Sequence, residues 1–151
     1  MILVNVTRSW LATNTPEKKI ETVERAWPTR NAVEVARMFE QEGDLLVAVA
    51  RGKIMSVRTI ESVTTDEGEP SRFVFMTTPF EAAASLIGVR SPVVWSRGEQ
   101  WPVKFAEKEE LLSMLEPMPS ATLGKFTATL TADGDLRVTC PKGGAVIVTT
   151  V

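Results

Sequence analysis

The chain has 151 residues, of which 44% are hydrophobic and 24% charged, a balance typical of one folded domain. It has no histidine, no tyrosine and one cysteine, which excludes histidine-dependent triads, histidine-ligated metal sites and a disulfide within the chain. The net charge is −2 and the pI is about 5.3, so binding to a nucleic acid would depend on a local basic patch.

The expected compartment follows from the hydrophobic runs and from the single cysteine. Residues 1–10 carry only a short apolar run before Asn5 and Arg8, which is shorter than the hydrophobic core of a signal peptide. No stretch approaches the roughly 20 apolar residues of a membrane span. A lone cysteine is typical of a reducing compartment. We therefore expect a cytoplasmic protein that has no membrane partner.

The first part of the chain is predicted to contain one strand and two short helices. The predicted elements are a strand over 2–6, then Arg8-Ser9-Trp10 followed by a polar loop up to Pro16, a helix over 17–26, and a second helix that starts near 29–31 and stops at Gly43. Thr15 and Pro16 have the residue types of an N-cap and a first helical position. Gly43 is a typical residue beyond a helix end.

The middle of the chain is predicted to alternate strands, turns and short helices. Residues 45–50 are a continuous apolar run, which indicates a buried strand, and Arg51-Gly52-Lys53 then forms a turn. The further predicted elements are strands over 54–63, 72–77, 92–95 and 102–105, and helices over 79–86, capped by Thr78, and 107–115.

The end of the chain is predicted to be a β-meander. Strands over 126–131 and 136–140 flank Asp133-Gly134, which is typical of a hairpin turn, and a last strand covers 145–151. This mixed order of elements predicts an α+β fold built on a small, curled, antiparallel β-barrel with flanking short helices. We expect residues 1–151 to form a single domain in which 120–151 are a β-meander extension.

The residues give no clear signal of catalysis. No phosphate-binding glycine motif is present, and Cys140 is interpreted as a small buried hydrophobic residue. The acidic residues gather in two clusters, which solubility and helix-end electrostatics explain: Asp66, Glu67 and Glu69, and Glu107, Glu109 and Glu110. We therefore expect no catalytic residue, metal or cofactor, and the composition favours a binding protein over an enzyme.

The tryptophans are the residues that most suggest ligand binding. Trp10, Trp27, Trp95 and Trp101 each lie within four residues of an arginine. Arginine beside an aromatic ring is a common way to hold a flat base and its phosphate, although ordinary packing gives the same pattern. Trp95 and Trp101 also bracket a loop in which Gln100 has the chemistry to pair with a base edge. The alternative is a plain β-turn at Gly98.

Three pieces of the chain carry a resemblance to a known group. They are LLVAVARGKI at 45–54, RFVF at 72–75, and LIG at 86–88 followed by RGEQWPVKF at 97–105. In this order they resemble small bacterial proteins of the PUA-like group, which includes the ASCH and EVE domains, over about Trp27 to Phe105. The resemblance implies a pseudobarrel whose mouth binds RNA or DNA at a modified or unpaired base.

The resemblance also implies roles for particular residues. Trp27 would stack on the base, and Arg51 and Lys53 would lie near the rim of the barrel. The polar contacts would come from three further residues: Arg72, Arg97 and Gln100.

Two alternatives to the binding module remain open. One is a protein-interaction or homodimerising domain that pairs through the final β-meander, where Thr127, Thr129 and Thr131 alternate. The other is a small ASCH-like hydrolase that acts on a nucleoside or RNA, in which Lys53 and Glu99 would be the reactive groups.

Overall fold

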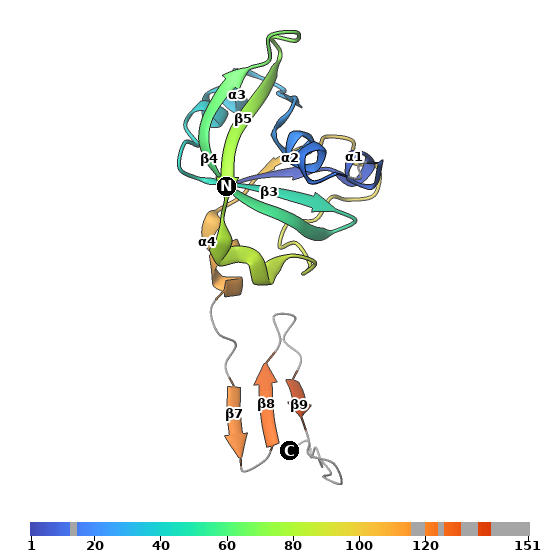
Figure 1. The fold of residues 1–151 in the computed structure, drawn as a ribbon, viewed down its shortest axis with the longest axis vertical. Coiled ribbons are helices and arrows are strands. Elements are labelled where there is room, and N and C mark those ends of the chain that lie inside the picture. The colour runs from blue at the N-terminus through green and yellow to red at the C-terminus, as the bar shows by residue number, and fades with distance from the viewer. Residues whose placement is uncertain (13–14, 116–119, 124–125, 131–135, 140–151) are drawn as a thin grey trace. The chain divides into compact units, whose positions relative to one another are not determined.

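The computed structural model describes residues 1–12, 15–115, 120–123, 126–130 and 136–139 (Figure 1). The chain divides into two compact units, Met1–Leu115 and Glu116–Val151. The boundary between them lies close to residue 120, where the sequence predicts the start of a β-meander extension.

The first unit contains the elements from β1 to η2, and the second contains three strands. The first unit has β1 (Ile2–Asn5), α1 (Thr7–Ala12), α2 (Pro16–Glu24), β2 (Trp27–Pro28), α3 (Ala32–Phe39), β3 (Leu45–Ala50), β4 (Lys53–Thr65), β5 (Arg72–Pro79), η1 (Glu81–Leu86), β6 (Val103–Phe105), α4 (Lys108–Leu112) and η2 (Ser113–Leu115). The second unit has β7 (Ser120–Leu123), β8 (Phe126–Leu130) and β9 (Leu136–Thr139).

The strands of the first unit form one mixed, six-stranded sheet in the order β2-β5-β4-β3-β1-β6. The sheet curls until its two edges approach each other. The Arg30 guanidinium, just after edge strand β2, lies 4.5 Å from the centre of the Trp101 ring, just before edge strand β6. The unit is therefore a nearly closed, barrel-shaped sheet with short helices, and the predicted α+β barrel is confirmed at this level (Figure 1).

The prediction of a purely antiparallel sheet is wrong at one pair of strands. β1 runs parallel to β3, with Ile2 opposite Leu46, whereas every other strand pair of this sheet is antiparallel. A parallel pair needs a crossover connection, and α1, α2 and α3 supply it between β1 and β3.

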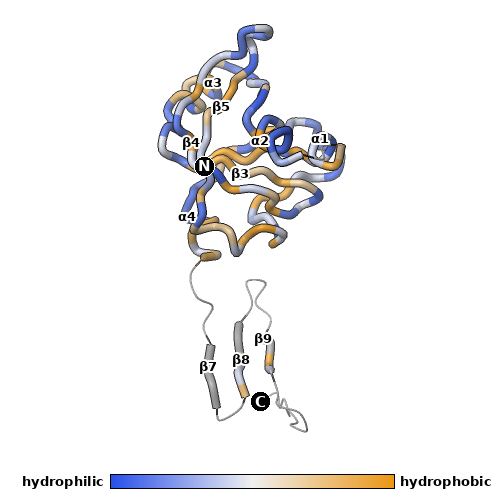
Figure 2. The backbone as a smooth tube through the Cα atoms, in the orientation of Figure 1, coloured by the Kyte–Doolittle hydropathy of each residue, from blue (hydrophilic) through white to orange (hydrophobic). Residues whose placement is uncertain are grey.

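β3 is a run of apolar residues (Figure 2). All six of its residues are buried, as the sequence predicts. Leu46 and Ala48 belong to an inner cluster that includes Phe75 of β5. The alternate residues Leu45 and Val47 belong to an outer cluster, which residues of η1 and α4 join. A strand between two layers of side chains has no wet face, so its sequence does not alternate.

The two predicted helix starts, at Thr15 and near 29–31, are confirmed, and each has a capping residue. The Thr15 side chain accepts a hydrogen bond from the Lys18 amide at the start of α2. Asn31 accepts from the amides of Val33 and Glu34, both at 3.0 Å, at the start of α3. The turn after β3 is also confirmed, since Arg51 and Gly52 have φ angles of 51° and 74°, as in a tight hairpin.

Three local predictions are wrong. Leu11 and Ala12, predicted to begin a polar loop, belong instead to helix α1. Thr78 belongs to β5 and does not cap η1, a 3₁₀ helix that follows Phe80 without a side-chain cap. Residues 92–95 form no strand, and the chain enters the sheet again only at β6.

The second unit is a three-stranded antiparallel sheet in the order β7-β8-β9. β8 and β9 confirm two predicted strands, and β7 is a strand that the sequence analysis did not predict. Asp133-Gly134, Cys140 and the predicted strand at 145–151 lie outside the described residues.

Candidate functional site

A large hollow in the first unit lies where β1 ends and β6 begins. It has a volume of about 830 Å³. Polar side chains from two distant parts of the sequence meet there. Its lining residues are Asn5, Thr7, Arg8, Gly98, Glu99, Gln100 and Pro102. We call it the Arg8–Gln100 hollow.

Hydrogen bonds at the end of β1 fix one wall of this hollow. The Asn5 amide donates to the Pro102 carbonyl at 2.7 Å, which joins the two walls at their base. The Asn5 side-chain oxygen accepts from the Thr7 amide at 3.1 Å, and α1 begins there. The Thr7 hydroxyl accepts from the Arg51 amide at 3.0 Å, so the β3–β4 turn is tied to this wall.

Lys104 holds the opposite wall, the loop that contains Gln100. Its ammonium donates to the Val94 carbonyl at 2.9 Å and lies 2.9 Å from the Glu99 carboxylate. Glu99 also accepts from the Ser96 amide at 3.0 Å. The hydrogen bond from Lys104, and then that from Ser96, lower the pKa of Glu99, so this carboxylate stays charged.

A hydrogen bond between the tryptophans at its two ends holds the loop in a closed shape. The Trp95 indole donates to the Trp101 carbonyl at 2.8 Å, and the Lys104 ammonium lies 5.3 Å from the Trp95 ring centre. Trp101 is half-buried beneath Arg30, and its indole nitrogen has no hydrogen-bond partner within the described part of the chain. Both rings therefore shape the loop, and neither lines the hollow.

Three arginines line the hollow or belong to segments that adjoin it. Arg8 lines it, Arg51 adjoins it through Thr7, and Arg97 precedes Gly98 in its loop. All three arginines are exposed. Among the residues that the structure describes, no carboxylate lies within ion-pair distance of any of them. The hollow is thus a local basic region on a chain whose net charge is −2.

The structure distributes the eight residues predicted to bind a ligand over separate places. Gln100 lines the hollow, and Arg51 and Arg97 are close to it in the chain or through a hydrogen bond. Lys53 is exposed at the start of β4, where its backbone forms an isolated antiparallel β-bridge with that of Arg90. Arg72 is bound to the Ala26 carbonyl at 3.0 Å and to Glu69.

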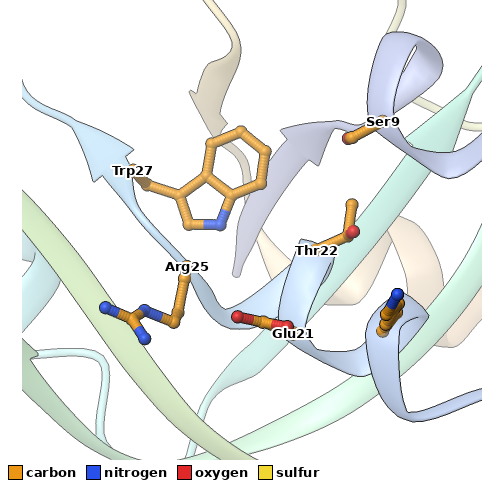
Figure 3. A pocket seen from close by; sticks show the side chains of 6 residues that line it. Ser9, Glu21, Thr22, Arg25 and Trp27 are labelled. Atoms are coloured by element: carbon orange, nitrogen blue, oxygen red, sulfur yellow. The ribbon is translucent and has the colours of Figure 1, made fainter. Parts of the chain in front are cut away.

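Trp27, predicted to stack on a base, is 7% exposed and belongs to the inner core cluster. Its indole nitrogen donates to the Val23 carbonyl at 2.6 Å, which fixes the ring. The ring borders a second, smaller hollow beside α2 (Figure 3). Only a small part of this ring is accessible to a ligand.

Asn5, Thr7 and Arg8 are lining residues that the sequence analysis did not select. A local signal for the first two was present, because an asparagine two residues before a hydroxyl residue, at a strand end, is typical of a side chain that caps a turn. No local signal linked them to Gln100, since the two walls are more than 90 positions apart in the sequence.

The described residues contain no group of three or more acidic or cysteine side chains arranged to hold a metal ion. Within the same residues, no helix is both long and apolar enough to cross a membrane. Asp66, from one of the acidic clusters, pairs with Arg25 at 2.9 Å and accepts from the Gly68 and Glu69 amides. These contacts, with the Arg25 hydrogen bond first, lower the pKa of Asp66, which has a structural role in its loop.

Comparison of the chain with protein-family models, with curated proteins and with solved structures finds no match in any of the three. Membership of the PUA-like group therefore stays a prediction, based on the three sequence pieces and on the barrel-shaped sheet.

Proposed function

We propose that the Arg8–Gln100 hollow binds a modified or unpaired base of RNA or DNA, in the manner of a PUA-like reader. The observation that carries this proposal is the position of Arg8, which has no carboxylate partner among the residues that the structure describes, beside two side-chain amides in one open hollow. Its volume of about 830 Å³ is within the range of small-molecule sites and is large enough for a nucleotide.

The lining groups match the parts of a nucleotide. Gln100 is exposed and offers both a donor and an acceptor, which is the pattern that pairs with a base edge. The Asn5 oxygen is bound to the Thr7 amide, so its NH₂ group remains as a second donor. Arg8 supplies a fixed positive charge for the phosphate.

The charge distribution favours contact with only a short part of a nucleic acid. An acidic protein does not attract a long polyanion through its overall field, but Arg8 in the hollow, with Arg51 and Arg97 in segments that adjoin it, is enough to bind one or two phosphates. This is consistent with a protein that recognises a base at a particular position instead of coating a strand.

The test is a fluorescence-anisotropy titration with labelled single-stranded and duplex RNA and DNA, with and without modified bases, at about 50 and 200 mM salt. We expect salt-sensitive binding that prefers a single strand or one modified base. The double variant Arg8→Gln/Gln100→Ala should bind at least about tenfold more weakly. Lys108→Gln, which removes a cation on α4, is the matched control and should bind as the wild type does.

Two results would overturn the proposal. One is the absence of binding at the lower salt concentration. The other is full affinity in the Arg8→Gln/Gln100→Ala variant.

Self-association is a second candidate function, because apolar and polar residues pair separately between β8 and β9. Ala128 pairs with Val138, whereas Thr127 pairs with Thr139. An apolar face of a sheet is stabilised by a second layer. Sedimentation equilibrium of the full chain, compared with Phe126→Ser, tests this candidate, and a wild-type monomer at every concentration would exclude it.

The hydrolase alternative has no such support. Glu99 is held by Lys104, and Lys53 is exposed and does not line the hollow.

A further inference from the structure

A second hollow lies beside the first, on α2. Its volume is about 360 Å³ (Figure 3). The residues that line it are Ser9, Lys18, Glu21, Thr22, Arg25 and Trp27. We call it the Lys18–Trp27 hollow.

Helix α1 is shared by the two hollows. Thr7 and Arg8 line the Arg8–Gln100 hollow, and the next residue, Ser9, lines the Lys18–Trp27 hollow. Consecutive residues of one six-residue helix therefore line the two hollows.

The second hollow also has the chemistry to bind a nucleotide. Lys18 is exposed, and among the described residues no carboxylate lies within ion-pair distance of it. The Arg25 side chain is 51% exposed, and its Nη2 atom contacts Asp66, so its other donors remain for a ligand. Glu21 offsets the positive charge of Arg25. The favourable position for a phosphate is therefore at the Lys18 end of the hollow.

Trp27 provides an apolar border at the other end of this hollow. Its ring is held by the hydrogen bond to Val23, so a base that packs against its accessible edge meets a rigid surface. Figure 3 shows the Trp27 ring facing the same space as Thr22 and Ser9.

We propose that the ligand is a single strand of at least two consecutive nucleotides that crosses α1, with one nucleotide in each hollow. This inference rests on the proposed function, and it narrows the ligand class from a base or free nucleotide to a short single-stranded segment. A free nucleotide fills one hollow only, and a paired strand keeps its bases stacked away from both depressions.

The experiment is a calorimetric titration of the full chain with 5′-phosphorylated oligonucleotides of one, two, three and four residues. We expect affinity to rise at least about tenfold from one to two nucleotides and then to level off, because the second hollow adds a phosphate and a base contact. The slope of log affinity against log salt should steepen by about 0.7 at the same step.

Variants distinguish the contributions of the two hollows to binding. Lys18→Gln should reduce the affinity for the dinucleotide to that for the mononucleotide, which itself stays unchanged. Arg8→Gln/Gln100→Ala should weaken both ligands, and Lys108→Gln should weaken neither. Equal affinity for one and two nucleotides in the wild type would overturn this inference and leave the proposed function intact. A rise in affinity from one to two nucleotides that Lys18→Gln does not reduce would overturn the assignment of the second hollow. A lack of binding at every oligonucleotide length would overturn both proposals.

Discussion

Thr77 is expected to be a strong determinant of stability, because its hydroxyl joins two charged groups inside the first unit. The hydroxyl accepts from Arg58 Nε and donates to the Glu24 carboxylate at 2.7 Å. Arg58 is 8% exposed and lies on β4, whereas Glu24 is on α2. The Thr77 hydroxyl therefore links the helix to the sheet.

Replacement of Thr77 by valine keeps the shape of the side chain and removes both bonds. The bonds from Arg58 Nη2 to the Thr77 carbonyl, at 3.0 Å, and from the Thr77 amide to Glu24, at 3.1 Å, remain. Each lost bond has a charged partner and is worth about 1.5–3 kcal/mol. Because the Glu24 side chain is 22% exposed, water replaces part of its bond, and we expect a total loss of about 2–4 kcal/mol.

Urea unfolding followed by tryptophan fluorescence measures this loss in the relevant unit. All four tryptophans lie within Met1–Leu115, so the signal reports only that part of the chain. Thr77→Ser restores the hydroxyl and should recover most of the free energy of unfolding. Thr64→Val, at an exposed threonine of the same sheet, should change it by less than about 0.5 kcal/mol. A Thr77→Val loss no larger than that of Thr64→Val would refute the reasoning.

Three further predictions concern the core, the hairpin turn and pH. Phe75 is fully buried, so Phe75→Ala should lower the free energy of unfolding by about 3–5 kcal/mol in the same urea assay. Gly52 has a φ of 74° with open space around it, so Gly52→Ala should cost about 1–2 kcal/mol through backbone strain alone; an unchanged midpoint would contradict this. The pKa of Asp66 is lowered by Arg25, so its stabilisation is complete above the ordinary value of about 3.9 and is lost as the pH falls through the lower folded value. Thermal unfolding between pH 6 and pH 2 should show a smaller loss for Asp66→Asn than for the wild type, and an equal loss would exclude this contribution.

Part of the fold was predictable because its signals are local. The apolar run of β3, the Thr15 cap, a helix start near 29–31 and the Arg51-Gly52 turn each depend on a few neighbouring residues, and each is confirmed. The alternation of Phe73 and Phe75 likewise agrees with their burial in β5.

The helix after Thr7 could not be predicted in this way. α1 has only six residues and is too short to be stable by its own propensity. Its start depends on the Asn5 side chain, and its position depends on contacts with β3 and α2. Thr78 shows the reverse case, because its type suits a cap but pairing with Thr59 in the sheet takes priority.

The sequence by itself determined the absence of histidine chemistry, five of the six strands of the barrel (all except β2), and the presence of Arg97 and Gln100 in one loop. The tertiary structure alone decided that Arg8 stands opposite Gln100 and that Trp27 is too buried to offer a full stacking surface. The physical reason is the pairing of β1 with β6, which brings together residues about a hundred positions apart that no local preference connects.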